Sequence, residues 1–495
     1  MNITELIDPF AASDRPALYF RDHVTSYRQL FENVQQVQAG LAAMNVEPGD
    51  RVILAAGTSP QFVTALFGVL RAGAVAVPVN PLAPAPEMRA EIDAVDPALV
   101  FVGPAAAAAL GECDLSCPVV KLLPGTVHED AVDFDDFLGE GGADLVAREP
   151  SDLALLIFTS GTAGAPKAAM LTHGNLEANI EQVNAHGANL ASQDDVVLGA
   201  LPLFHILGLN MLLGVFLRSG ASIVLVERFD AIGAVELIKR HGVTSVSGPP
   251  AMWQAWANLP EITAADFATL RTAVSGAAGL PRDVANRVQE RLGVPLSQGY
   301  GLTEAAPVLT LGAGTGAPAT SVGRPLPGVH LRLVDTDGHD VPVGDEGEIW
   351  AKGANVFPGY LDNPAATERA LTPDGWLRTG DIGVVDDDGY LYIVDRSKDL
   401  IVVSGFNVFP GEVEEALRTH ESIADAAVIG VPHPASGEAV KAFVVASNGA
   451  VLEEAEVIRH CESLMARYKC PQSVEVVTEL PRGTAVGKVR RRDLR

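Results

Sequence analysis

Continuous apolar runs that alternate with helical patterns constrain the fold of this chain most strongly. One helical pattern spans Pro60 to Arg71, and similar patterns separate the other apolar runs. Uninterrupted apolar strands between helices are typical of parallel sheets that are covered on both faces. We therefore expect an α/β fold whose large N-terminal domain contains parallel-rich sheets. The candidate strands are residues 51–56, 74–79, 99–102, 153–158, 222–226 and 245–247.

The pattern changes after about residue 320. Alternating residues at 330–335 and 347–351 indicate a hairpin with a turn at Asp337-Gly338, and Asp388-Gly389 suits a tight primed turn. These signals predict a small β-subdomain. The last hundred residues contain two helical patterns and two strands, enough for a small α+β domain. We therefore place the domains at 1–395 and 396–495.

Composition excludes some functions. The 495 residues carry a formal net charge of −27, which disfavours binding to nucleic-acid phosphates. The basic run from Lys488 to Arg495 is either a solvated tail or a local anion site. The four cysteines form two distant pairs without a histidine at zinc spacing, so we expect reduced thiols in the cytoplasm.

One stretch, Leu198 to Leu217, is about as long as a membrane-spanning helix, ~20 residues. It contains Pro202, His205 and Asn210, and it continues into a candidate strand. We therefore predict a buried helix–strand unit and no integral membrane segment. The acidic first residues also lack the basic-then-apolar order of a secretory signal.

A strand followed by a hydroxyl- and glycine-rich loop is the strongest local motif. It runs from Leu155 to Lys167 and includes the candidate phosphate ligands Thr159, Ser160, Gly161, Thr162, Gly164 and Lys167. Backbone N–H groups and hydroxyls of such a loop can face phosphate oxygens, and the lysine adds a charge. A Walker loop requires a Gly-Lys-Ser/Thr ending, which this segment lacks. A polar surface turn is the alternative interpretation.

Two further motifs contain groups suited to a nucleotide. In Gln298 to Glu304, glycines flank Tyr300, whose ring could stack on a flat base, and Glu304 offers a carboxylate to Mg²⁺. In Trp376 to Asp381, a carboxylate beside glycine suits ribose hydroxyls, although an Asx-type turn would look the same. The segment 395–399, Asp-Arg-Ser-Lys-Asp, follows.

In this order, the motifs resemble the adenylate-forming (AMP-binding) superfamily, which includes acyl-CoA synthetases, coumarate-CoA ligases, luciferases and peptide-synthetase adenylation domains. The resemblance covers nearly the whole chain. Further matches occur at 201–208, 275–279, 347–353, 359–364, 404–410 and 487–488.

The resemblance implies a role for each matching residue. The loop from Thr159 to Lys167 would hold the β- and γ-phosphates of ATP. Thr303 would touch the α-phosphate, and Glu304 would bind Mg²⁺. Lys488 would bridge the carboxylate and the α-phosphate during attack. The adenine slot would be formed by Gly276, Ala277, Ala278, Gly299, Tyr300 and Gly301, and the ribose would be held by Asp381 and Arg396.

The resemblance also implies two reactions performed with two orientations of a small mobile C-terminal domain. The hinge position matches Lys398, and Gly405 and Phe406 match the loop that lines the pantetheine tunnel. ATP, Mg²⁺ and CoA are therefore the expected cofactors. Three departures stand out: Ala163 replaces a common threonine, Ala168 replaces a usual glycine, and the 481–488 loop has one extra residue, with Val486 where threonine is common.

The expected acid pocket is mostly apolar or small. No lysine or arginine is among its residues, which disfavours dicarboxylates and amino acids because a second charge would be buried unpaired. A medium- or long-chain fatty acid is the first choice, and a cinnamate- or benzoate-type acid is the alternative. The pocket residues are Phe204, His205, Leu209, Leu213, Ser247 to Met252, Ser275 to Ala277, Gly299, Gly301 and Ala305.

Three classes of protein remain open. An acyl-CoA synthetase is favoured because 379–396 lacks the insertion that some acyl-AMP ligases carry before the hinge, and we expect no carrier domain after Arg495. An acyl-AMP ligase that loads a carrier protein is the second class. A non-catalytic binding protein is the third class. The lengthened 481–488 loop is compatible with it, but four intact residues argue against it: Lys167, Glu304, Asp381 and Lys488. The sequence does not fix the oligomeric state, for which a homodimer is one alternative.

Overall fold

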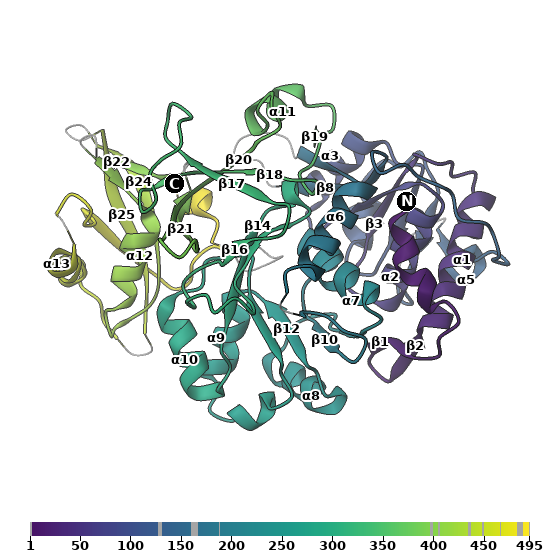
Figure 1. The fold of residues 1–495 in the computed structure, drawn as a ribbon, viewed down its shortest axis with the longest axis horizontal. Helices are drawn as coiled ribbons and strands as arrows, with labels where there is room; N and C mark the ends of the chain where they lie inside the picture. The colour runs from purple at the N-terminus through teal and green to yellow at the C-terminus, as the bar shows by residue number, and fades with distance from the viewer. Residues whose placement is uncertain are drawn as a thin grey trace. The chain divides into compact units, whose positions relative to one another are not determined.

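Buried strands and amphipathic helices form two units in the computed structural model of this chain (Figure 1). The first unit comprises Met1–His330 and Ala351–Leu377, and the second comprises Leu331–Trp350 and Arg378–Arg495. The division therefore does not follow a single cut in the sequence, and a boundary at 395 stays a prediction. The structure describes residues 2–126, 131–159, 167–187, 189–396, 399–403, 406–433, 437–447, 450–465, 467–482 and 489–494.

One sheet of the first unit has eight strands among the described residues, in the order β19-β9-β8-β4-β3-β5-β6-β7. Its middle strands pair in parallel, whereas β9 and β19 join one edge antiparallel. The central strands are buried along their length, as the uninterrupted apolar runs predict. The strands are β3 (Arg51–Ala55), β4 (Val75–Pro78), β5 (Leu99–Val102), β6 (Val119–Lys121), β7 (Val132–Asp133), β8 (Leu153–Thr159), β9 (Lys167–Thr172) and β19 (Gly359–Tyr360).

The second sheet of this unit has nine strands among the described residues, in the order β16-β15-β14-β13-β12-β10-β11-β1-β2. Parallel pairing runs from β1 through β14, so the carboxyl ends of β12, β13 and β14 meet at one edge. The strands are β1 (Pro16–Phe20), β2 (His23–Ser26), β10 (Val196–Gly199), β11 (Ser222–Leu225), β12 (Ser245–Gly248), β13 (Thr272–Ser275), β14 (Ser297–Gly301), β15 (Val308–Leu311) and β16 (Arg324–Pro325).

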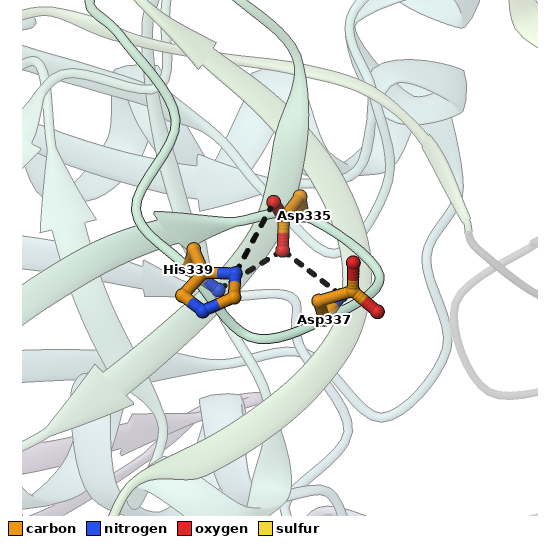
Figure 2. Close-up of side chains that lie close together, drawn as sticks. All are labelled: Asp335, Asp337 and His339. Carbon is orange, nitrogen blue, oxygen red and sulfur yellow. Dashed lines mark hydrogen bonds and ion pairs between the residues drawn. The ribbon is translucent and has the colours of Figure 1, made fainter.

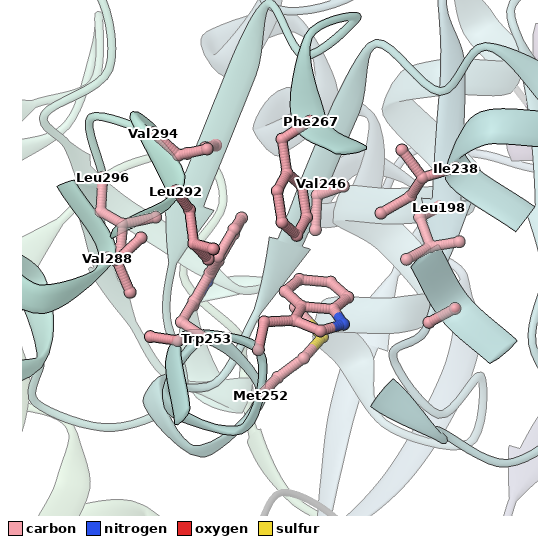
Figure 3. Close-up of a cluster of buried hydrophobic side chains, with 14 of the residues drawn as sticks. Leu198, Ile238, Val246, Met252, Trp253, Phe267, Val288, Leu292, Val294 and Leu296 are labelled. Carbon is pink, nitrogen blue, oxygen red and sulfur yellow. The ribbon is translucent and has the colours of Figure 1, made fainter. Parts of the chain in front are cut away.

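Helices cover both sheets of the first unit. A buried core that includes Trp253 and Trp256, both fully buried, packs between the second sheet and its helices. Figure 3 shows Trp253 among its neighbours in this core. The helices of this unit are η1 (Ile3–Phe10), α1 (Tyr27–Ala43), α2 (Pro60–Arg71), α3 (Ala85–Val95), α4 (Ala107–Gly111), α5 (Phe134–Phe137), α6 (His173–Asn184), η2 (Leu207–Gly214), α7 (Val215–Arg218), α8 (Ala231–His241), α9 (Pro250–Asn258), η3 (Ala264–Phe267), α10 (Arg282–Leu292), η4 (Thr303–Ala305) and α11 (Pro364–Ala370).

The apolar stretch from Leu198 to Leu217 divides into the end of β10, the π-helix η2 and the start of α7. Most of its residues are buried in the first unit, and the others, among them Phe204 and His205, are half-buried. The predicted buried helix–strand unit is therefore confirmed. Within the described ranges, no helix has both the length and the apolar character needed to cross a membrane.

The second unit contains two smaller antiparallel-rich sheets. One has the order β17-β18-β20-β21, and the other has the order β23-β22-β25-β24, with β26 parallel to β25. Together with the first unit, this arrangement confirms the predicted α/β class with a β-subdomain and a small α+β part. The elements are β17 (His330–Val334), β18 (Gly347–Lys352), β20 (Leu377–Val385), β21 (Leu391–Arg396), β22 (Ile401–Val403), β23 (Phe406–Val408), α12 (Pro410–Arg418), β24 (Ile423–His433), β25 (Gly437–Ala446), α13 (Glu454–Leu464), β26 (Ser473–Val477) and η6 (Arg491–Leu494).

A carboxylate holds the turn that follows β17. The backbone N–H groups of Asp337 and His339 both donate to Oδ1 of Asp335 at 2.9 Å (Figure 2). The three side chains bring possible metal-ligand atoms within 4.8 Å of one another, but all three are exposed. These hydrogen bonds are those of an Asx-type turn, so they account for the grouping without an ion.

The turn between β20 and β21 corrects one prediction. Asp386 N–H donates to the carbonyl of Tyr390, so the loop encloses three residues, and only Gly389 among them has a positive φ, of 79°. A two-residue primed turn at Asp388-Gly389 is therefore wrong, because Asp388 keeps an ordinary φ. The observed form is the three-residue hairpin loop that requires a left-handed residue at its last position.

Candidate active site

Strands β8 and β9 bring the two ends of the predicted phosphate loop together. Thr159 ends β8 and Lys167 begins β9, and the two residues are register partners. Thr159 Oγ1 donates to the carbonyl oxygen of Lys167 at 3.5 Å. Ser160, Gly161, Thr162 and Gly164 lie outside the described residues. The two ends of the loop are thus joined by strand pairing, and Lys167 is the first residue after the loop.

The predicted adenine residues lie directly after β13 and within the neighbouring parallel strand β14. Ser275 at the end of β13 pairs with Gln298 in β14, so Gly276 lies beside Gly299. A Cβ atom placed on Gly276 would lie 4.0 Å from the carbonyl oxygen of Gly299. Ala277 has a φ of 67°, in the left-handed region that non-glycine residues seldom adopt. Such strain is found preferentially at functional sites.

A tight loop after β14 presents Thr303 and Glu304. The Leu302 N–H donates to the carbonyl oxygen of Pro307 at 2.9 Å. A Cβ atom on Gly301 would lie only 1.9 Å from that same oxygen, so glycine is required for the close approach. Thr303 and Glu304 begin the single turn η4, and both are half-buried.

Tyr360 links Glu304 to Lys167. Its hydroxyl donates to Oε1 of Glu304 at 2.6 Å, and the Lys167 Nζ atom lies 5.3 Å from the centre of its ring. Burial, followed by the neighbouring Glu304 carboxylate, raises the pKa of Tyr360 well above its usual range, so its hydroxyl remains a donor. The sequence matched Gly359-Tyr360 to the family but gave Tyr360 no role.

Four asparagines hold the irregular backbone around Glu304. Their side-chain amides donate to main-chain carbonyls of 305–308 and 354–356 at 2.7 to 3.3 Å. All four side chains are buried, so each donor replaces a hydrogen bond that water cannot supply. The sequence analysis did not identify these asparagines. The only sequence feature that could have indicated them is an amide side chain close to apolar residues. They are Asn175 and Asn179 in α6, Asn210 in η2, and Asn355.

The predicted acid-pocket residues lie at the end of β12, in α9 and in the segment from Phe204 to Leu213. Leu209 and Leu213 lie in η2 and are buried, and Met252 in α9 is 4% exposed. A Cβ atom on Gly248 would lie 2.0 Å from the Met252 methyl carbon, so this thioether covers the strand end. Ser247 is buried in β12, while Phe204 and His205 precede η2 and are half-buried. His205 Nδ1 accepts from the Leu207 N–H at 3.3 Å.

The second unit holds the remaining predicted residues. Asp381 in β20 and Arg396 in β21 are register partners, and Asp381 is 7% exposed. Phe406 begins β23 and pairs with Val403. Lys398, Gly405 and Lys488 lie outside the described residues. The hairpin thus brings the two expected ribose ligands opposite one another.

Known families match both parts of the chain. The AMP-binding enzyme family matches residues 10–361, and the AMP-binding enzyme C-terminal domain matches residues 412–488. The chain belongs to the AMP-binding enzyme family. It is an ATP-dependent, AMP-forming acyl-CoA synthetase.

Relatives and solved structures agree along the whole chain. It is 38% identical to a long-chain-fatty-acid–CoA ligase of Yersinia pestis, covering 98% of this chain and 92% of the relative. It is also 38% identical to a feruloyl-CoA synthase of Amycolatopsis sp, covering 95% and 93%. The fold resembles ATP-bound MatB from Rhodopseudomonas palustris with a TM-score of 0.91 and 31% identity, covering 100% and 98%.

Proposed function

We propose that this enzyme activates a long-chain fatty acid as its acyl-adenylate, with Mg²⁺, and transfers the acyl group to CoA. One observation carries the activation step: Lys167 and Glu304, which are distant in sequence, meet at the two sides of Tyr360. A phosphate-binding cation and a metal-binding carboxylate are the groups that a nucleotide triphosphate with Mg²⁺ requires. The long-chain-fatty-acid–CoA ligase of Yersinia pestis supports the choice of acid.

The residues present fit a magnesium ion. Mg²⁺ is usually bound through one or two carboxylates and substrate phosphates, and Glu304 supplies a carboxylate beside the phosphate-loop lysine. Among the described residues, the hydrogen bond from Tyr360 engages only Oε1 of Glu304. When bound, the ion would neutralise phosphate charge as pyrophosphate departs.

The proposed reaction has two displacements. In the first, a carboxylate oxygen forms a bond to the α-phosphorus, and the bond to the β-phosphate oxygen breaks, which releases pyrophosphate. Lys167 and Lys488 would screen the anions as they approach. In the second, the CoA sulfur forms a bond to the acyl carbon, the carbon–oxygen bond breaks, and AMP leaves. The thiol proton passes to solvent.

The apolar lining favours an apolar acid. Leu209, Leu213 and Met252 offer no charge partner for a second carboxylate, whose burial would cost several kcal/mol, roughly 2–7 even for a neutral polar group. A saturated chain gains ~0.8 kcal/mol for each buried methylene. These contributions favour a long alkyl chain.

Pyrophosphate exchange with a panel of acids tests this proposal. We expect ATP- and Mg²⁺-dependent exchange that is fastest with fatty acids of long chain and slower with ferulate and benzoate. Faster exchange with ferulate than with fatty acids would show that the substrate is an aryl acid. The absence of exchange with every acid would refute the enzymatic activity.

The acceptor is tested separately. With acid, ATP and CoA together, we expect stoichiometric AMP and acyl-CoA. Acyl transfer to a carrier protein but not to CoA would replace the proposed acceptor while leaving acid activation intact.

A further inference from the structure

Strand β19 joins the 359–364 motif to the lysine-bearing strand. Gly359 pairs with Met170 and Tyr360 with Ala169, and the Leu361 N–H donates to the Ala168 carbonyl at 2.9 Å. Tyr360 therefore lies on the strand that flanks the exit of the phosphate loop. Its position is fixed to the same backbone that carries Lys167.

Further contacts fix the tyrosine ring and its neighbours. The Tyr360 N–H donates to Thr367 Oγ1 at 3.0 Å. The Phe357 ring packs edge-on against the Tyr360 ring, with centroids 5.0 Å apart and an interplanar angle of 80°. The Phe357 N–H donates to the carbonyl oxygen of Glu304 at 2.9 Å. The Tyr360 backbone is thus held by strand pairing and by a helix side chain. Its ring packs on a buried aromatic whose own N–H binds the Glu304 backbone.

We propose that Tyr360 is a positioning residue that aims the Glu304 carboxylate at the metal and supports the Lys167 ammonium group. The inference rests on the proposed function, in which Glu304 binds Mg²⁺. The hydroxyl donates to Oε1 of Glu304 at 2.6 Å, which fixes the carboxylate and would leave Oε2 for the ion. The ring face attracts the Lys167 cation, a contact that leaves the ammonium donors available to phosphate oxygens.

Two chemical roles of one side chain can be separated by substitution. Tyr360→Phe removes the hydroxyl and keeps the ring, whereas Tyr360→Leu removes both. Outer partners of metal ligands are worth about 10-fold to 100-fold in metal affinity. We therefore expect Tyr360→Phe to weaken metal binding about 10-fold without changing the affinity for metal-free nucleotide. Tyr360→Leu should weaken both.

The experiment measures binding rather than turnover. Mn²⁺ replaces Mg²⁺ as the probe, and its binding to the full chain with a non-hydrolysable ATP analogue is followed by electron paramagnetic resonance. Binding of the analogue without metal is measured by calorimetry. Tyr392→Phe is the matched control, because the Tyr392 hydroxyl also donates to a carboxylate, Oδ2 of Asp386 at 2.9 Å, in the second unit. It should leave both affinities unchanged.

Glu304→Gln distinguishes failure of this inference from failure of the proposed function. If Glu304→Gln weakens Mn²⁺ binding and Tyr360→Phe does not, the positioning role is refuted and the metal ligand stands. If neither change weakens Mn²⁺ binding, both assignments are refuted. Glu304→Asp, which withdraws the carboxylate by one methylene while leaving Tyr360 in place, should reproduce the loss of metal affinity. It provides the test if Tyr360→Phe does not fold.

Discussion

Several side chains near Glu304 contribute by fixing the conformation of the main chain that carries it. The Asn355 Nδ2 atom donates to the carbonyl oxygens of Ala305 and Val308 at 2.8 and 3.3 Å, so it holds the chain on both sides of the turn after Glu304. The sequence pattern identifies Glu304 because a carboxylate in a glycine-containing motif is a recognisable candidate for binding Mg²⁺. It does not identify Asn355, because the value of a buried amide depends on which carbonyl it meets in three dimensions.

We expect Asn355→Leu to lower the free energy of unfolding by about 1–3 kcal/mol, because it leaves a buried carbonyl without its donor. We also expect slower pyrophosphate exchange under conditions in which the variant is folded. Gln38→Leu is the matched control, since Gln38 is a buried amide that donates to the Asp144 carbonyl at 2.7 Å, far from the motif in sequence. Equal effects of the two changes on exchange would refute a local role for Asn355.

Elements were predicted most accurately where burial alone determines them. Helix α2 and strand β5 have the predicted bounds, Pro60–Arg71 and Leu99–Val102, because both are apolar along their length and end at clear signals. The π-helical form of η2 was not predicted, because its hydrogen-bond pattern leaves no distinct apolar period. The turn before Tyr390 was wrong because its type depends on the φ angle of Asp388, which composition does not determine.

The basic end of the chain is a second case in which the sequence did not predict the contacts of an element. Arg490 bonds to Asp493 at 2.9 Å, and Arg491 contacts Glu414 at 2.8 Å and Asp399 at 3.4 Å. Arg491 is therefore engaged by two carboxylates, whereas Arg490 pairs within the run and stays about half exposed. The partners of Arg491, Glu414 and Asp399, are far from the run in the sequence.

We expect Arg491→Ala to destabilise α12 by ~3 kcal/mol, because it leaves the buried Glu414 carboxylate without its main partner. Amide exchange across residues 410–418 should then accelerate on the order of 100-fold. Arg490→Ala is the control, because its more exposed pair should contribute less than about 1 kcal/mol. Similar acceleration in both variants would show that burial of Glu414 is not decisive.

At the scale of the whole molecule, the order of motifs along the chain was sufficient to predict the class of enzyme. Lys167 and Glu304 both contact Tyr360 in the first unit, and Asp381 is the register partner of Arg396 in the second. Tyr360 was overlooked because the 359–364 motif matched the family, but no chemical role for the tyrosine followed from that match. The roles carried over to Lys398, Gly405 and Lys488 stay predictions.

We expect Lys488→Ala to slow adenylation by about 10²–10³-fold, the usual effect of removing a group that stabilises developing charge. Thiolation of supplied acyl-adenylate should survive. The two half-reactions are measured separately, with Lys441→Ala as the control, because Lys441 pairs with the exposed Glu475 of the second unit. Equal loss of both half-reactions would indicate misfolding or a different role for this lysine.

The interleaved course of the chain has a consequence for inheritance. Residues 331–350 belong to the second unit although residues 351–377 return to the first. A single recombination event between two related genes near codon 395 would therefore take β20 and most of β21 from one parent, and Arg396 with everything from β22 onward from the other. Its breakpoint falls inside the β20–β21 ladder, so Asp381 and its register partner Arg396 would come from different ancestors.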